Sequence, residues 1–238
     1  MSRHAPPRSR PHPPQRPEAT ARGNSITSVS PTSQSLHTSD PSAPSWSGLG
    51  GTNTNVLEPV ECPRQTAWMD VTVAQVSAEA CGAFVAAARA SRGLHHPWIN
   101  PPDSAERFEE WLDRLRRDDQ EAYLIRHDSC GELVGYVSVS NIVRRAFQSA
   151  QLGYGAFASH AGRGLMTQGL STVIELCFHE LGLHRLEANI QPTNEPSLAI
   201  VRKLGFEREG YSPRYLMVDS DWRDHERWAI RTEIWNPS

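Results

Sequence analysis

The stretch 160–167 carries two glycines, separated by one residue, and reads His-Ala-Gly-Arg-Gly-Leu-Met-Thr. Gly162 and Gly164 allow successive backbone N–H groups to converge on an anion at a helix N-terminus, where unpaired donors and the helix dipole favour phosphate. A tight turn that binds no ligand shows the same pattern. Neither a P-loop nor the longer dinucleotide-binding pattern fits, because no Gly-Lys-Ser/Thr follows and the third glycine is missing.

A second group of polar residues lies further along the chain. Asn194 and Ser197 follow a segment with strand character and open a short helix, which ends in the sequence Lys203-Leu-Gly-Phe206. Together, Gly-x-Gly before a helix, Asn-x-x-Ser and Lys-Leu-Gly-Phe resemble the acetyl-CoA site of the GNAT N-acetyltransferases. The stretch 208–225 and the loop His96-Pro-Trp98 are similar to the branch of that family that contains ribosomal-protein-alanine N-acetyltransferases.

The resemblance extends over about residues 68–236 and implies acetyl transfer from acetyl-CoA to a primary amine by direct attack in a ternary complex. It implies that pyrophosphate binds the backbone amides of Ala161, Gly162, Arg163, Gly164, Leu165, Met166 and Thr167. The pantetheine arm would add like a strand beside Ala156, Phe157 and Ala158. Asn194 would hydrogen-bond that arm, and a backbone N–H near the end of the strand would bind the thioester carbonyl.

Acetyl transfer to an amine requires that the ammonium group loses a proton and that the departing sulfur gains one. Many family members use a tyrosine of the short helix as the acid, but Val201 stands at that position here. The resemblance makes Ser197 the donor to sulfur, although a serine at a helix start is often an ordinary cap. Glu187 is a candidate base acting through water, or else a solvent-facing residue. A base is not essential for an α-amine, whose pKa of about 7.7–8.0 leaves it partly neutral at pH 7.

Two loops are candidates for binding the amine substrate. One contains His96 and Trp98. The other, 219–225, reads Asp-Ser-Asp-Trp-Arg-Asp-His, and its acids, with Asp219 first, would attract a cationic N-terminus or a basic peptide beside Trp222. A polar hairpin loop whose tryptophan packs on its own sheet explains the same residues.

The remaining histidines, the cysteines and the charge exclude other classes. His179 and His184 are five residues apart, which places them on different faces of a helix, and the adjacent His95 and His96 have no obvious third ligand, so we predict no metal. The four cysteines form no C-x-x-C pair, so we expect reduced thiols. No run of apolar residues is as long as the about 20 residues that a membrane-spanning helix needs. The net charge of −3 does not favour nucleic-acid binding. We therefore expect a cytoplasmic protein without membrane or nucleic-acid partners.

Residues 1–60 differ in composition from the rest of the chain. They hold 10 of the 18 prolines and carry a charge of +2, whereas 61–238 carries −5. Too few large apolar residues are present to offset the entropy of ordering. We expect a disordered Pro-, Ser- and Arg-rich arm over 1–60 and a GNAT N-acetyltransferase domain over 61–238. A dispensable extension explains the arm better than a targeting peptide, since its prolines oppose an amphipathic helix.

The spacing of apolar residues predicts the elements that must position these groups. We expect strands over 71–76, 122–126, 133–141, 151–157, 185–191, 206–218 and 226–235. We expect helices over 77–90, 103–115, 164–180 and 195–204, with Asp103 as the cap of the second one and a non-helical, proline-rich loop over 94–102. The fold class is α/β (α+β), and the resemblance implies the GNAT fold, a mixed, mostly antiparallel central sheet of about seven strands flanked by about four helices.

The acceptor is not fixed by the fold. By resemblance we expect the N-terminal α-amine of a protein or peptide, with a ribosomal protein as a candidate partner. A small amine or a peptide natural product is the alternative, which an enclosed pocket behind Trp98 and Trp222 would favour, whereas an open groove would favour a protein N-terminus. A non-catalytic CoA-binding module is the alternative of another class, because the tyrosine expected at position 201 is absent.

Overall fold

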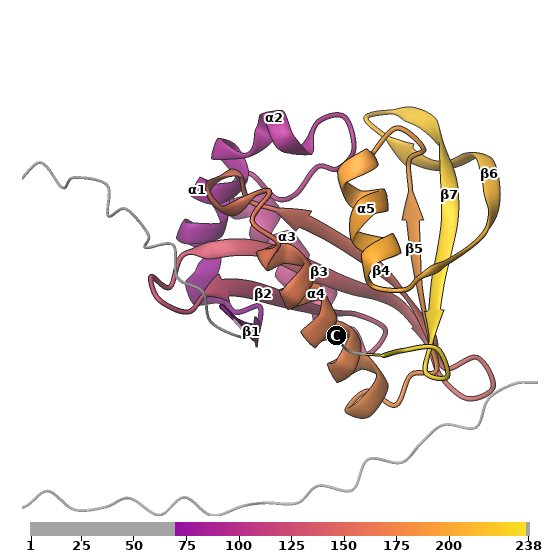
Figure 1. Cartoon of the computed structure of the whole chain (residues 1–238). Helices are drawn as coiled ribbons and strands as arrows, with labels where there is room; N and C mark the ends of the chain where they lie inside the picture. Colours follow the sequence, from indigo (N-terminus) through magenta and orange to yellow (C-terminus); the bar gives the residue numbers. More distant parts are fainter. Residues whose placement is uncertain (1–69, 237–238) are drawn as a thin grey trace, which may run out of the picture. The chain divides into compact units, whose positions relative to one another are not determined.

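Within residues 70–236, which the computed structural model describes, seven β-strands form one sheet in the order β1-β2-β3-β4-β5-β7-β6 (Figure 1). The strands are β1 (Val71–Gln75), β2 (Glu121–His127), β3 (Leu133–Val143), β4 (Ser149–Ala156), β5 (Arg185–Ile190), β6 (Glu207–Val218) and β7 (Asp221–Arg231). Only β4 and β5 pair in parallel, and the other neighbours are antiparallel. The predicted mixed, mostly antiparallel sheet is therefore confirmed. The arm expected over 1–60 lies outside the described residues.

Helices connect these strands. They are the α-helices α1 (Cys81–Ala90), α2 (Arg92–His95), α3 (Ala105–Leu115), α4 (Leu165–His179) and α5 (Glu195–Lys203), with the short 3-10 helices η1 (Ala78–Ala80) and η2 (Ala158–His160). The parallel pair β4 and β5 is joined through α4, because parallel strands need a long crossover that returns the chain to the same end of the sheet.

Hydrophobic side chains cover both faces of the sheet. In β2, Tyr123 and Ile125 belong to the core beneath α4 and α5, whereas Leu124 belongs to the core beneath α1 and α3. This alternation follows from the geometry of a strand, in which successive side chains point to opposite faces. Figure 1 shows the two groups of helices on the two sides of the sheet. Phe84 of α1 lies at the centre of an aromatic cluster, with its ring centroid 5.2 Å from that of Trp111.

The segment after α1 differs from the sequence prediction, which placed a non-helical loop over 94–102. The chain continues into the short helix α2, and the His95 N–H donates to the Ser91 carbonyl at 3.0 Å. Pro97 is the first residue that cannot continue a helix, so one more helical turn fits before it. Gly93 does not prevent that turn, since glycine within a helix costs only about 1 kcal/mol.

Helix α3 begins with a different cap from the predicted Asp103. The Arg107 N–H donates to the Ser104 hydroxyl at 3.3 Å, so Ser104 is the cap. Asp103 binds the guanidinium groups of Arg92 and Arg107 at 2.8 and 2.6 Å, and these hydrogen bonds lower the pKa of its carboxyl. Serine caps a helix as well as aspartate does. The carboxylate is therefore released for two ion pairs while the helix keeps a cap.

The last hairpin is tighter than predicted. β6 and β7 are joined by the two-residue turn Asp219-Ser220, whose φ angles are 52° and 63°. Two consecutive residues with positive φ are typical of a type I′ turn, which matches the twist of the flanking strands. β7 therefore begins at Asp221 rather than at Glu226, and Trp222 lies in a strand instead of a loop. The turn lacks the glycine that usually marks this geometry in a sequence.

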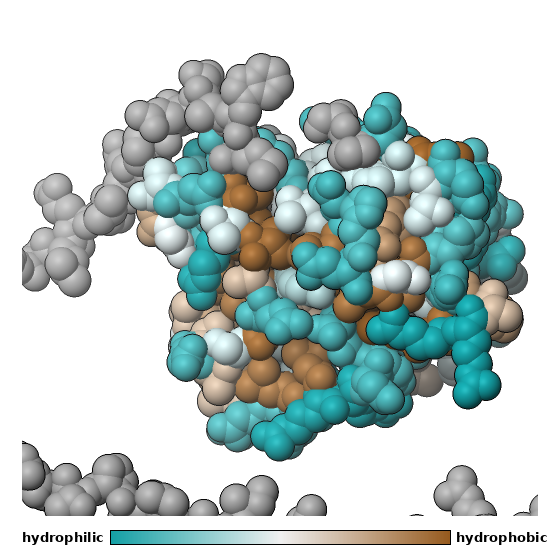
Figure 2. Space-filling view, turned by 90° about the horizontal axis from the view of Figure 1, so that it is seen from below, coloured by the Kyte–Doolittle hydropathy of each residue, from teal (hydrophilic) through white to brown (hydrophobic). Residues whose placement is uncertain are grey.

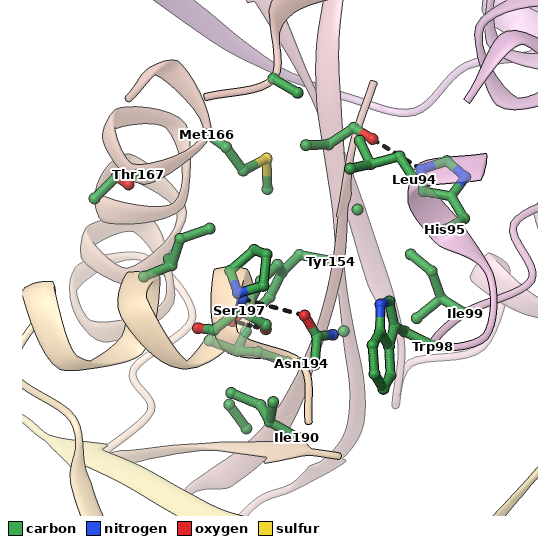
Figure 3. A pocket seen from close by; sticks show the side chains of 18 of the residues that line it. Leu94, His95, Trp98, Ile99, Tyr154, Met166, Thr167, Ile190, Asn194 and Ser197 are labelled. Carbon is green, nitrogen blue, oxygen red and sulfur yellow. Dashed lines mark hydrogen bonds between the residues drawn. The ribbon is translucent and has the colours of Figure 1, made fainter. Parts of the chain in front are cut away.

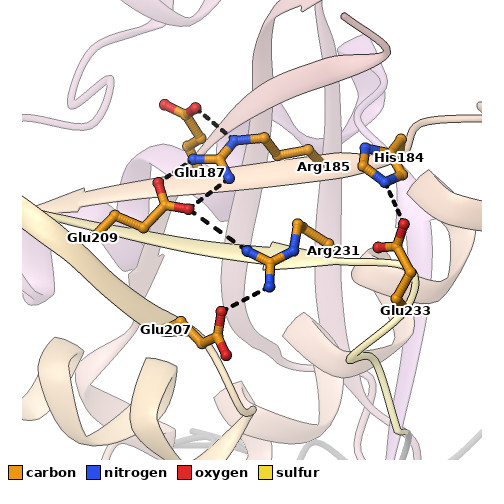
Figure 4. Close-up of polar contacts among 7 residues, drawn as sticks. All are labelled: His184, Arg185, Glu187, Glu207, Glu209, Arg231 and Glu233. Carbon is orange, nitrogen blue, oxygen red and sulfur yellow. Dashed lines mark hydrogen bonds and ion pairs between the residues drawn. The ribbon is translucent and has the colours of Figure 1, made fainter.

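Charged side chains link β5, β6 and β7 (Figure 4). Arg185 of β5 lies 2.9 Å from Glu187 and also binds Glu209 of β6. Arg231 of β7 lies 2.8 Å from Glu207 and 3.7 Å from Glu209. Because it is bonded to two carboxylates, Arg185 has a raised pKa, and in turn it lowers the pKa of the Glu209 carboxyl. These ion pairs tie the three strands together at the end of the sheet.

The surface mixes both kinds of side chain. Figure 2 shows one face, on which hydrophobic residues gather in the middle and hydrophilic residues border them. Such a mixture is ordinary, since apolar atoms contribute roughly 55–60% of the accessible surface of folded proteins. Of the helices described, none has both the length and the apolar character that crossing a bilayer requires.

Candidate functional site

A cavity opens where two neighbouring strands of the sheet separate (Figure 3). β4 and β5 pair as far as Leu152 and Ala188. Beyond that point β4 stays paired with β3 alone up to Ala156, and β5 runs on to Ile190. The cavity between the separating ends has a volume of about 500 Å³. It therefore exposes strand edges that would otherwise be paired inside the sheet.

The end of β4 presents backbone donors to this cavity. The Phe157 N–H donates to the Val134 carbonyl, which precedes the β3 partner of Ala156, at 2.8 Å. Backbone groups of consecutive residues in a strand point to opposite sides, so the N–H groups of Tyr154 and Ala156 point away from β3, toward the cavity. An extended ligand can add to such an edge like a further strand. One of these N–H groups can also stabilise a developing oxyanion.

The glycine loop forms the wall of the cavity at the start of α4. Gly162 and Gly164 have φ angles of 74° and 81°, in the left-handed region that residues with a Cβ avoid. Gly164 precedes the first turn of α4 and supplies no side-chain cap to the first N–H groups of that helix. The Thr167 N–H donates to the Gly164 carbonyl at 3.0 Å and so belongs to the helix itself. Leu165 is buried in the core, and Arg163 does not line the cavity. The predicted loop residues that line it are Ala161, Gly162, Gly164, Met166 and Thr167.

Two hydroxyl groups meet in the wall between β4 and α5 (Figure 3). The Tyr154 hydroxyl lies 2.7 Å from Ser197 Oγ, and both residues line the cavity. The Ser197 N–H donates to Asn194 Oδ1 at 3.3 Å, so Asn194 is the cap of α5. Burial raises the pKa of Tyr154 to about 12. Sequence reasoning missed Tyr154, because no local spacing relates it to a serine in another element. Val201 is fully buried in the core.

Two side chains from the end of α1 and from α2 hold the chain between β4 and the glycine loop. His95 Nε2 donates to the Ala156 carbonyl at 2.8 Å, and the Ala158 N–H donates to Ser91 Oγ at 2.9 Å. Burial lowers the pKa of His95, which is therefore neutral at pH 7. Of these two adjacent histidines, His95 lines the cavity, whereas the predicted His96 is exposed and does not line it. Of the three predicted strand residues, Ala156 alone lines the cavity, while Phe157 is buried in the core and the Ala158 N–H is bonded to Ser91.

The predicted substrate residues are only partly brought together. Trp98 lines the cavity. Asp219 accepts a hydrogen bond from the side chain of Asn100, which joins the last hairpin to the loop that follows Trp98. Trp222 is 54% exposed on β7 and does not line the cavity. The two tryptophans therefore do not enclose a common pocket.

No carboxylate lines the cavity among the residues that the structure describes. Glu187, the predicted base, is ion-paired with Arg185 and lies outside the lining (Figure 4). His225 of β7 does line the cavity, and burial lowers its pKa as it does for His95. The residues that form the site are therefore apolar or neutral polar groups.

A known family combines these features. The family model described as an acetyltransferase (GNAT) domain matches residues 71–207. The chain belongs to the GNAT acetyltransferase family. The family model and the N-acetyltransferase relatives show that this GNAT protein is an acetyl-CoA-dependent N-acetyltransferase. The alternative of a non-catalytic CoA-binding module is therefore set aside. The exposed edge of β4 and the glycine loop at α4 fit the extended arm and the phosphates of that co-substrate.

Individual relatives agree with this assignment. RimJ of Mycobacterium smegmatis, solved in complex with CoA-disulfide, is 31% identical with a TM-score of 0.63, over 68% of this GNAT chain and 82% of that chain. The probable N-acetyltransferase YjcK of Bacillus subtilis is 37% identical over 125 residues, 52% of this chain and 69% of its own length. The [ribosomal protein uS5]-alanine N-acetyltransferase of Escherichia coli is 39% identical over 106 residues, 44% of this chain and 55% of its own length.

Proposed function

We propose that this enzyme acetylates the N-terminal α-amine of a protein or peptide, with ribosomal proteins as the candidate class. The observation that carries the proposal is the lack of any carboxylate among the described residues that line the cavity. An α-amine has a pKa of about 8 and a lysine side chain about 10.4, so at neutral pH the neutral, nucleophilic fraction of the α-amine is roughly 200 times larger. A site without a base favours the acceptor that needs none.

The shape of the site and one relative support the same acceptor. Trp98 lines the cavity while Trp222 stands outside it, so the tryptophans do not close off a pocket for a small amine. The Escherichia coli relative is named for acetylating the alanine of a ribosomal protein. A ribosomal acceptor would place the reaction in the cytoplasm.

The two hydroxyls of Tyr154 and Ser197 would act on the departing sulfur. The attacking nitrogen forms a bond to the thioester carbonyl carbon, and the carbon–sulfur bond breaks. The Tyr154 hydroxyl has a pKa of about 12, whereas a thiol has a pKa of about 8.5, so full transfer of this proton would cost roughly 5 kcal/mol. We therefore assign Ser197 a hydrogen bond to the sulfur, strengthened by its own bond to Tyr154. The proton that neutralises the thiolate comes from the nitrogen of the acceptor.

The experiment that tests the acceptor is mass-spectrometric analysis of products formed by the full chain from acetyl-CoA. The acceptors are peptides that begin with Ala or Ser, the same peptides with a blocked N-terminus and an internal lysine, and small amines including spermidine. We expect one acetyl group on the free α-amine and none on the blocked peptides. Acetylation of lysine or of small amines in preference to α-amines would contradict the proposal and support the small-amine alternative.

A further inference from the structure

Three side chains of metal-binding types converge beside the glycine loop. Cys130 and Glu132 belong to the turn between β2 and β3, and His160 is the last residue of η2. One ligand atom from each lies within 4.8 Å of the others. His160 is 3% exposed, and its Nε2 lies 3.0 Å from Glu132 Oε2. In a tetrahedral site with bonds of about 2.1 Å, two ligand atoms are separated by roughly 3.4 Å. The 3.0 Å between His160 Nε2 and Glu132 Oε2 is close to this separation.

We infer that Cys130, Glu132 and His160 form a binding site for a zinc-class divalent ion. The donor set is one thiolate, one imidazole and one carboxylate, which suits zinc, whereas magnesium and calcium select oxygen ligands. Three protein ligands leave the fourth position of a tetrahedral ion to water. This inference departs from the sequence prediction of no metal, which weighed only the pairs His179/His184 and His95/His96. In the structure His184 is bonded to Glu233 and His95 to the Ala156 carbonyl.

Charge and protons balance when the ion binds. His160 Nδ1 lies 3.1 Å from Arg163 Nη1, which can only donate, so the ring proton is on Nε2 and is donated to Glu132. The ion takes the Nε2 lone pair, the ring proton moves to Nδ1, and the exposed Arg163 side chain turns into water. Cys130 releases its thiol proton to solvent. The two positive charges are then neutralised by one thiolate and one carboxylate, with the net release of one proton for each ion bound.

The position of the site gives the ion a structural role. His160 lines the cavity and directly precedes the glycine loop, whereas Cys130 and Glu132 lie on a hairpin turn that does not line it. An ion held by all three would tie that turn to the segment leading into Gly162 and Gly164. Because it binds the folded chain through two segments far apart in sequence, it should stabilise the fold by mass action.

The test is a titration of the untagged full chain, freed of metal by a chelator, with Co²⁺ as the probe. Cobalt occupies zinc sites, and a thiolate ligand gives it a charge-transfer absorption in the near ultraviolet. We expect a band that saturates at one ion per chain and disappears when Zn²⁺ is added. C130S should lose the band, and E132Q should bind Co²⁺ more weakly. Thermal unfolding should shift upward with Zn²⁺ in the wild type and not in C130S.

Matched controls separate this site from the other thiols of the chain. C62S and C81S should keep the full band, and Cys177 is buried with its pKa raised to about 12, so it is a poor thiolate. Circular dichroism of the metal-free proteins checks that C130S and E132Q fold like the wild type. The absence of a near-ultraviolet band in the wild type, its persistence in C130S, or an unchanged affinity in E132Q would each overturn the inference. None of these readouts depends on which amine the enzyme acetylates.

Discussion

The sequence offers Ser197 two alternative roles, as a helix cap or as a donor to the sulfur, and in the structure Ser197 is not the cap. Its N–H is the donor that Asn194 caps, so the capping role belongs to Asn194, and its hydroxyl is left to bond Tyr154 inside the cavity. In the proposed mechanism Tyr154 supplies, from a strand, the hydroxyl that the family resemblance would place on the short helix, where this chain has the buried Val201.

Tyr154→Phe and Ser197→Ala should each lower kcat by about tenfold or more, because each removes part of the hydrogen bonding to the departing sulfur. The KM for acetyl-CoA should change little. In the double variant kcat should fall no further than in Ser197→Ala, since Tyr154 acts on the sulfur only through its bond to Ser197. With an acyl donor whose thiol is more acidic, the defect should shrink. Steady-state kinetics with acetyl-CoA and with the more acidic acyl donor measure kcat and KM for each variant.

Tyr123→Phe is the control for that experiment, because Tyr123 is a buried tyrosine of β2 that does not line the cavity. Its kcat should stay near the wild-type value. A Tyr154→Phe enzyme with unaltered kcat, or an equal defect with both acyl donors, would remove Tyr154 and Ser197 from the chemistry of the sulfur.

Trp98→Ala should raise the KM for the acceptor peptide by roughly tenfold, since an aromatic side chain that lines a binding cavity often contributes 1–2 kcal/mol or more. Trp222→Ala should leave this KM unchanged, because Trp222 does not line the cavity. Initial-rate measurements with varied peptide at saturating acetyl-CoA test both variants. A larger effect at Trp222 would move the acceptor site to the last hairpin.

The separation of β4 and β5 is the element-scale feature on which the site depends. The two strands pair only as far as Leu152 and Ala188, and the glycine loop lies at the start of the helix that connects them. His95 fixes the end of β4 through the Ala156 carbonyl, and Ser91 Oγ accepts a hydrogen bond from the N–H of Ala158, two residues further on. The short helix α2 and the residue before it therefore hold the segment that leads to the glycine loop.

Gly164→Ala should raise the KM for acetyl-CoA by about tenfold. The added Cβ meets no neighbour, but a left-handed φ of 81° costs a residue with a Cβ about 1–2 kcal/mol. The loop would relieve this strain by moving amides that should bind phosphate. Calorimetric titration with CoA measures the loss directly.

Gly82→Ala is the matched substitution, because Gly82 lies in α1, far from the cavity lining and with open space for a Cβ. It should leave CoA binding unchanged and stabilise the fold by about 0.5–1 kcal/mol, as alanine does in a helix. Equal CoA affinity for Gly164→Ala and wild type would show that the left-handed conformation is not needed for binding.

For the molecule as a whole, the free energy of unfolding should fall as the pH drops below about 6.5. The folded state lowers the pKa of His95 and His225 through burial, whereas in the unfolded chain both take up a proton near pH 6.5. Above that pH both histidines are neutral in the folded and in the unfolded state, so they do not change the free energy of unfolding. Below it the unfolded state binds more protons, so stability decreases as acid is added.

Urea unfolding between pH 7 and pH 5 measures this slope. His95→Gln and His225→Gln should each flatten it, because each removes one histidine that must stay neutral in the fold. The carboxyl groups with lowered pKa, such as Asp103 and Glu209, affect stability only at lower pH, near and below their ordinary range. A slope that is the same in wild type and both variants would contradict this origin.

Local features were predictable wherever a short range of residues determines them. The glycine loop, the cap at Asn194 and the order of strands and helices from position 71 onward, except the short helix α2, follow from spacing within a few residues. Two local predictions were wrong. Asp103 binds two nearby arginines while Ser104 caps α3, and the turn at Asp219 forms without the glycine that usually marks it in a sequence.

The sequence by itself determined the family, the sheet with its main helices and the glycine loop before α4, because these are set by local conformation and by the pattern of apolar residues. The tertiary structure alone decided which polar groups meet. Tyr154 is hydrogen-bonded to Ser197, 43 residues away in sequence, and His95 to the Ala156 carbonyl, 61 residues away. It also turned Glu187 into an ion-pair partner of Arg185 instead of a cavity residue. These contacts depend on where β4 and β5 separate and on how α2 packs against β4. The spacing of residues along the chain does not predict either arrangement.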